Sequence, residues 1–168
     1  MIWVTRNYVH VDRVACPWLI QRFVDREAEF LFVPAEEVQK VADAVGGTPF
    51  DIKGAELGHV GDQCTFNAII KKFNLRDPAL LELAEVVRAA DTGSIDKTSL
   101  AVGLEAIATG IPLVSFNDHD SLQKQMAVYD SLLAFFRYKR LEEQYHGKMK
   151  QMTRKERNEF FKKKYSSP

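Results

Sequence analysis

Three motifs of this chain combine a histidine with a nearby carboxylate residue, a pattern typical of metal ligands. The pairs are His10 with Asp12, Glu56 with His59, and Asp118 with His119. Imidazole nitrogens and carboxylate oxygens together suit borderline divalent ions better than they suit a soft-metal thiolate site. The six residues therefore predict a mixed site for a divalent transition metal, with Zn, Mn, Fe and Ni as candidates.

The spacing of Glu56 and His59 is informative only together with the glycines around it. Residues three apart share a face in a helix, but Gly54, Gly58 and Gly61 argue against a helix here. In a straight strand the two side chains point to opposite faces. They converge if the backbone turns at Gly58, which glycine permits. The sequence leaves both geometries open.

An anion can also be bound near the first of these motifs. Arg6 and Arg13 flank the segment that contains His10 and Asp12, and a helix start beside them offers free N–H groups. These two arginines are the predicted anion-binding residues. The structural alternative is that Asp12 caps the helix while Cys16 packs in the core.

The elements that must position these residues follow from the apolar pattern. Strand-forming residues occur at 2–4, 29–33 and 50–52, and helical patterns follow at 12–23 and 36–45. The order β-α-β-α-β predicts an α/β fold with a small, mostly parallel three-stranded sheet covered by helices. Sites in such sheets form at the carboxyl ends of the strands, where residues 10–12 lie.

After residue 60 the pattern predicts a helical C-terminal half. The predicted helix starts are Thr65, Asp77 with Pro78, Thr98 or Ser99, and Ser115 or Asn117, and Gly110 with Pro112 should end the third helix. The longest helix carries an apolar stripe that we interpret as core: Leu122, Met126, Tyr129, Leu133 and Phe136.

A net charge of zero conceals two oppositely charged parts. Residues 1–136 contain 12 basic and 19 acidic residues, a net charge of −7, and residues 137–164 contain 11 basic and 4 acidic residues, a net charge of +7. We therefore divide the chain into an α/β domain at 1–144 and a basic C-terminal tail at 145–168, helical or disordered. Thr153 and Glu156 have capping-box spacing within this tail.

Composition excludes several classes of protein. An apolar fraction of 46% excludes global disorder, and no stretch approaches the ~20 apolar residues of a membrane span. The N-terminus lacks a secretory pattern, and two cysteines are too few for a disulfide scaffold. We expect a cytoplasmic protein with no membrane partner. Nucleotide-binding loops and a nucleophile elbow are absent from the sequence.

Several segments resemble the chromate-resistance protein B family. They are HVDRVACPWLI (residues 10–20), EFLFVP (29–34), PFDI (49–52), ELGH (56–59), CTF (64–66) and ADT (90–92). Their order and spacing match over about residues 1–140, and the first motif is long and contains rare residues. The resemblance implies a stand-alone copy of the family's C-terminal domain, which belongs to a bacterial stress response to chromate. Because the family's N-terminal region is lacking, DNA binding is not expected of this segment.

Three hypotheses about function follow. In the first, the chain is a metal- or oxyanion-responsive domain that binds a small oxyanion such as chromate. In the second, it is a metal-dependent enzyme of unknown substrate, in which a divalent ion activates water or binds a redox substrate and Glu56 or Asp91 is the general base. In the third, it is a non-catalytic interaction module, a homodimer or a domain whose basic tail contacts an acidic partner.

Overall fold

The fold is built on a small parallel sheet. The structure is a computed structural model, and it describes residues 1–59, 61, 63–94 and 98–165. Within this part of the chain the strands are β1 (Ile2–Arg6), β2 (Glu29–Val33) and β3 (Thr48–Pro49). β1 lies in the middle and pairs in parallel with both neighbours. The predicted α/β class and three-stranded parallel sheet are confirmed.

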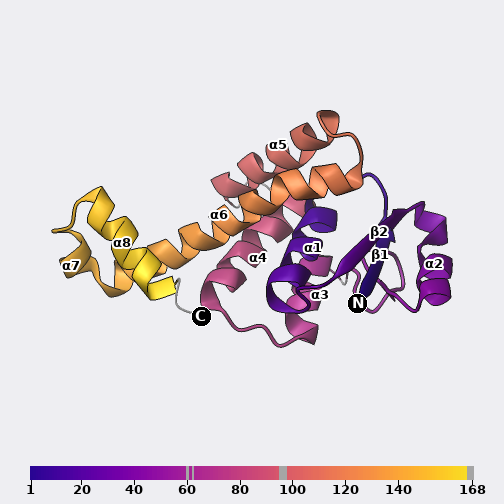
Figure 1. The fold of residues 1–168 in the computed structure, drawn as a ribbon, viewed down its shortest axis with the longest axis horizontal. Helices are drawn as coiled ribbons and strands as arrows, with labels where there is room; N and C mark the ends of the chain where they lie inside the picture. Colours follow the sequence, from indigo (N-terminus) through magenta and orange to yellow (C-terminus); the bar gives the residue numbers. More distant parts are fainter. Residues whose placement is uncertain (60, 62, 95–97, 166–168) are drawn as a thin grey trace.

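The two faces of the sheet have different covers. Successive side chains of a strand point to opposite faces. Accordingly, Trp3 packs in the main core with α1 (Val11–Phe23), whereas the adjacent Val4 packs with Ala42 of α2 (Val38–Val45). The two helices therefore lie on opposite sides of the sheet, as Figure 1 shows. A short 3₁₀ helix, η1 (Ala35–Glu37), leads into α2.

The C-terminal half is helical, as predicted. Its helices are α3 (Thr65–Lys72), α4 (Pro78–Asp91), α5 (Ser99–Leu113), α6 (Asp118–Gln144), α7 (His146–Met149) and α8 (Arg154–Tyr165). The Trp18 ring of α1 stacks on Phe66 at 6.3 Å and also contacts Tyr129 at 5.7 Å. This aromatic group joins α1, α3 and α6 into one core. None of the described helices has the length and apolar character needed to cross a membrane.

Most of the predicted helix boundaries agree with the structure. Asp77, Thr98 and Asn117 each accept a hydrogen bond from a backbone N–H at the start of their helix. The helix of residues 99–113 is longer than predicted, because it continues through Gly110 and Pro112. Pro112 lies in its last turn, so only hydrogen bonding at the end of the helix is affected.

Two local predictions at the sheet edge are wrong, and both concern residues of the candidate functional site described below. His10, and not Asp12, occupies the N-cap of α1, and Asp12 lies buried in the first turn. β3 ends at Pro49 instead of including residues 50–52, because the chain turns at Asp51, whose φ is +54°. Asp51 therefore leaves the strand and turns toward α1.

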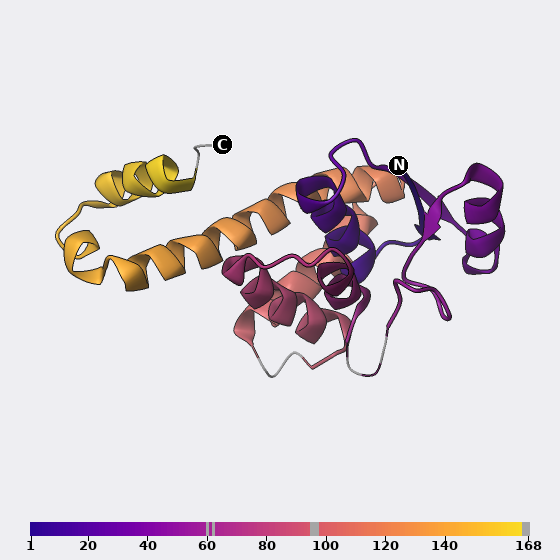
Figure 2. The same cartoon turned by 90° about the horizontal axis from the view of Figure 1, so that it is seen from below.

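The described part of the basic tail is a helical hairpin on the end of α6. Figure 2 shows α6 extending away from the sheet and α8 turning back along it. Phe161 of α8 contacts Tyr138 of α6, with ring centroids 6.1 Å apart. The capping box is present, because Thr153 Oγ1 accepts from the Glu156 N–H and Glu156 accepts from the Thr153 N–H. Residues 166–168 of the predicted tail lie outside the described residues.

Candidate functional site

Asp12 is the central residue of a buried acidic cluster at the carboxyl end of the sheet. Its side chain is 1% exposed and its Oδ2 accepts a 2.6 Å hydrogen bond from the backbone N–H of Thr65, at the start of α3. Its Oδ1 is buried and has no hydrogen-bond partner among the described residues. A buried carboxylate oxygen with no donor is costly, so this atom is the first sign of a missing ligand.

Asp51 joins the cluster from the turn after β3. Aspartate tolerates the left-handed backbone conformation that this turn requires. Asp51 Oδ2 accepts from Arg6 at 3.2 Å and from Arg13 at 3.0 Å, and its Oδ1 accepts from the Thr65 hydroxyl at 3.1 Å. The charge of this buried carboxylate is therefore well compensated, unlike that of Asp12.

His59 brings an imidazole to three carboxylates at once. Its Nε2 lies 3.4 Å from Asp12 Oδ2, 3.3 Å from Asp51 Oδ1 and 3.2 Å from Asp91 Oδ2. The hydrogen bond to Asp12 and the charges of the three carboxylates raise the pKa of His59, against the opposing effect of partial burial. The ring is 43% exposed, so it forms the solvent side of the cluster.

Asp91 completes the acidic group from the last residue of α4. Its Oδ1 accepts from the Asp12 backbone N–H at 3.3 Å. Burial, and next the negative charge of Asp12, raises the pKa of Asp91 to about 6. The C-terminal end of a helix is also its negative pole, which disfavours a carboxylate. Asp91 thus satisfies one free N–H group at the start of α1, but burial and the neighbouring Asp12 disfavour its charged form.

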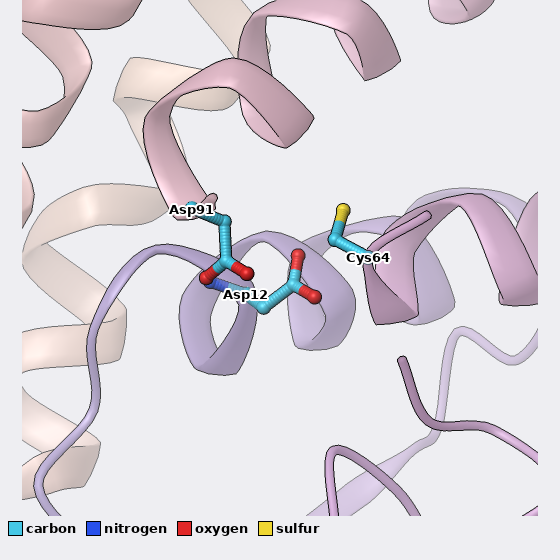
Figure 3. A group of neighbouring side chains, drawn as sticks. All are labelled: Asp12, Cys64 and Asp91. Carbon is cyan, nitrogen blue, oxygen red and sulfur yellow. The ribbon is translucent and has the colours of Figure 1, made fainter. Parts of the chain in front are cut away.

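Cys64 lies against the two aspartates from the N-cap of α3. One ligand atom from each of Asp12, Cys64 and Asp91 falls within 4.8 Å of the others, and the same holds for Asp12, Asp51 and His59. Figure 3 shows the first of these groups where the first turn of α1, the end of α4 and the start of α3 meet. Burial, and next the negative charge of Asp12, raises the pKa of the Cys64 thiol well above its usual range.

An open pocket adjoins the cluster on the solvent side of His59. It has a volume of about 700 Å³, and its lining includes Arg6, Lys53 and Gly54 as well as Asp51 and His59. The pocket lies beyond the carboxyl ends of the strands, where parallel sheets commonly bind ligands. A ligand in the pocket can therefore reach the edge of the acidic cluster.

The structure places the predicted site residues in separate locations. Of the predicted metal ligands, Asp12 and His59 come together, and Asp91, predicted as a general base, lies beside them. Arg6 and Arg13, the predicted anion-binding residues, both bind Asp51.

The other predicted ligands lie apart from this cluster. His10 Nε2 lies 3.4 Å from the Thr109 hydroxyl. Glu56 is exposed and pairs with Lys72. Asp118 accepts from the backbone N–H groups of Tyr8 and Val9, and the His119 ring contacts Phe32.

Two residues of the cluster were not among the predicted ligands. Asp51 was assigned to a strand, although its position at the end of the third strand is where a parallel sheet places ligand residues. Cys64 had no local signal, because neither of its carboxylate neighbours in space is near it in the sequence.

Comparison with known proteins places the chain in a family. The family model described as "ChrB, C-terminal domain" matches residues 3–136. The chain belongs to this family. Protein ChrB of Cupriavidus metallidurans is 37% identical over 135 residues, which cover 80% of this chain and 40% of that protein. The chain thus spans less than half the length of this relative. No solved structure matches it.

The ChrB family match bears on both the motifs and the site. The family whose domain model matches is the one that the sequence motifs resemble. The matched range also contains every residue of the acidic cluster, whereas α7 and α8 lie beyond it.

Proposed function

We propose that this ChrB-type chain is a metal-binding domain that holds one divalent ion between Asp12, Asp91 and His59, with Asp51 beside them. The observation that carries the proposal is the buried Oδ1 of Asp12, which has no partner among the described residues. A divalent cation supplies the missing positive contact. Arg6 and Arg13 neutralise the charge of Asp51 only. A bound cation would also neutralise the negative charge of the other carboxylates.

The spacing of the donor atoms supports this assignment. Nitrogen and oxygen donors bind Zn²⁺ at about 2.0–2.2 Å, so two donors that share one ion lie roughly 3.0–3.5 Å apart. His59 Nε2 lies 3.2 Å from Asp91 Oδ2 and 3.4 Å from Asp12 Oδ2, the second oxygen of the carboxylate whose Oδ1 has no partner among the described residues. An ion can therefore enter with small side-chain rotations, and the partly exposed ring of His59 is free to make them.

The competing explanation is that a protonated His59 is itself the counterion of the cluster. Only the proposed metal site predicts that the protein binds a metal ion. We would purify the full chain, remove metal with a chelator, and titrate Zn²⁺ by calorimetry into the wild type and His59→Ala. His10→Ala is the matched control, since His10 lies at the Thr109 hydroxyl, outside the cluster.

The proposal predicts about one ion per wild-type and His10→Ala chain, and binding weaker by at least about tenfold in His59→Ala. Absence of saturable binding by the wild type, with the chain folded, contradicts it. Equal binding by all three chains contradicts the assigned position of the ion.

A small oxyanion is a second candidate ligand, favoured by the pocket beside His59. Arg6 and Lys53 line this pocket, and Arg6 is 44% exposed although it also binds Asp51. We propose that chromate or a similar dianion contacts these cations next to the bound ion. Titration of the zinc-loaded chain with chromate and with sulfate tests this, and Lys53→Ala should weaken binding. Absence of binding by both anions contradicts it.

A further inference from the structure

We propose that Cys64 supplies a thiolate ligand to the same ion, which makes the centre specific for thiophilic or borderline metals such as Zn²⁺, Co²⁺ and Cd²⁺ over Mg²⁺ and Ca²⁺. This inference rests on the proposed metal site and adds the class of ion that it selects. On binding, the S–H bond breaks, a metal–sulfur bond forms, and the proton passes to the solvent.

The position of Cys64 supports this role. Its sulfur and one oxygen from each of Asp12 and Asp91 lie within 4.8 Å of one another. Figure 3 shows the three side chains as neighbours. The cysteine is fully buried, and its S–H donates to the Asn67 side-chain oxygen at 3.3 Å. A small rotation of the side chain turns the sulfur from Asn67 to an ion held by the two aspartates.

A second observation, independent of the cysteine, points to the same place. The unpartnered Oδ1 belongs to Asp12, which is common to both groups of possible ligands. His59 approaches Asp12 and Asp91 from the solvent side, and Cys64 approaches them from the protein interior. His59 and Cys64 belong to different groups of possible ligands that share Asp12, so an ion that binds both draws the two groups together by side-chain rotation.

The local backbone also suits a thiolate. Cys64 is the N-cap of α3, where free N–H groups and the helix dipole favour a negative charge. The Asn67 backbone N–H acts in this direction on the sulfur. Burial and next the charge of Asp12 act against a thiolate by raising the pKa of Cys64, so a cation between the carboxylates and the sulfur is needed to stabilise the thiolate.

The choice of ion follows from ligand chemistry. Mg²⁺ and Ca²⁺ take oxygen ligands almost exclusively, and Mg²⁺ also retains several waters. Two carboxylates, one imidazole and one thiolate form instead a four-donor set typical of Zn²⁺ and of ions that replace it. Without Cys64, the remaining nitrogen and oxygen donors discriminate less strongly against harder ions such as Mn²⁺.

Cobalt spectroscopy on the full metal-free chain tests the inference. Co²⁺ bound by a thiolate shows a sulfur-to-cobalt charge-transfer band in the near ultraviolet, in addition to its visible bands. Cys64→Ser should lose the near-ultraviolet band and bind Co²⁺ at least about tenfold more weakly. Cys16→Ser is the matched control, because Cys16 is also a buried free thiol but is in neither group of possible ligands.

The outcomes separate this inference from the proposed function. If wild-type protein binds Co²⁺ without the charge-transfer band, Cys64 is not a ligand and the metal site stands. If it binds no Co²⁺ at all, both proposals fail. Should Cys64→Ser misfold, the wild type still decides, since a hundredfold excess of Mg²⁺ must leave the band unchanged and Cd²⁺ must remove it.

Discussion

The acidic cluster at the sheet edge and the basic hairpin of α7 and α8 are the two charged regions of this molecule. In the cluster, the buried Asp12 and the partly buried Asp91 share a single histidine. In the hairpin, the charged side chains are exposed apart from the partly buried Arg157, and Lys148 and Lys164 lie over aromatic rings. Charge at a solvated surface costs little, whereas buried charge without a counterion is expensive. A bound cation would therefore lower the free energy of the cluster considerably, whereas the solvated charges of the hairpin need no counterion.

The largest effect on stability should come from the loss of an ion pair of Asp51, the buried acid of the cluster that pairs with two arginines. Arg13→Ala removes one of the two arginines bound to buried Asp51, so the free energy of unfolding should fall by about 3 kcal/mol in urea denaturation. Arg22→Ala is the matched control, because its partner Asp130 is 43% exposed, and its loss should stay below about 1 kcal/mol. Equal losses would remove the distinction between buried and exposed pairs.

The largest effect on binding should come from Asp12. Asp12→Asn keeps an acceptor for the Thr65 N–H but removes the charge, so Zn²⁺ affinity should fall by about a hundredfold in calorimetry. Asp43→Asn provides the control, since Asp43 is an exposed residue bonded to Gln39. Unchanged affinity in a folded Asp12→Asn protein would place the ion elsewhere.

Asp91→Asn should stabilise the metal-free chain, by about 1–3 kcal/mol at pH 7. The pKa of Asp91 is raised to about 6 in the folded chain, chiefly by burial. The folded wild type therefore binds more protons than the unfolded chain between about pH 4 and 6, and it loses stability as the pH rises through this window. The advantage of the variant should vanish below about pH 4. A destabilised variant at pH 7 would mean that the cluster holds the fold together.

The smallest effect should come from the hairpin. Phe160→Ala removes an edge contact with Tyr145 at 5.3 Å, and we expect a loss of about 1 kcal/mol in thermal unfolding. Zn²⁺ affinity should not change, because no hairpin residue belongs to the cluster. A change in affinity would show that the two regions are coupled.

The sequence predicted the fold better than it predicted the site. Apolar periodicity and capping residues are local signals, so the sheet and most helix starts were identified. Ligand groups form instead between distant segments: Asp12 meets Thr65 across 53 positions, and Asp118 caps the Tyr8 and Val9 backbone across more than a hundred. Spacing along the chain therefore grouped His10 and Asp118 with Asp12, although in space they serve other contacts.

The position of the site in the fold was predictable from the sequence, although several of its residues were not. Ligands of parallel sheets gather at the carboxyl ends of the strands, and this rule led to the segment of residues 10–12. Asp51 was not identified, because the turn that brings it to Arg13 depends on a left-handed backbone conformation at Asp51 itself. The sequence pattern does not indicate that conformation.

The central claim is that Asp12, Asp91 and His59 hold a divalent ion. A crystal structure of the zinc-loaded chain, with anomalous data at the zinc edge, tests it most directly. We predict one peak within about 2.0–2.4 Å of donor atoms from these three residues, with the Cys64 sulfur completing the site. Absence of a peak at saturating zinc, with His59 Nε2 still 3.2–3.4 Å from the three carboxylates, would contradict the claim.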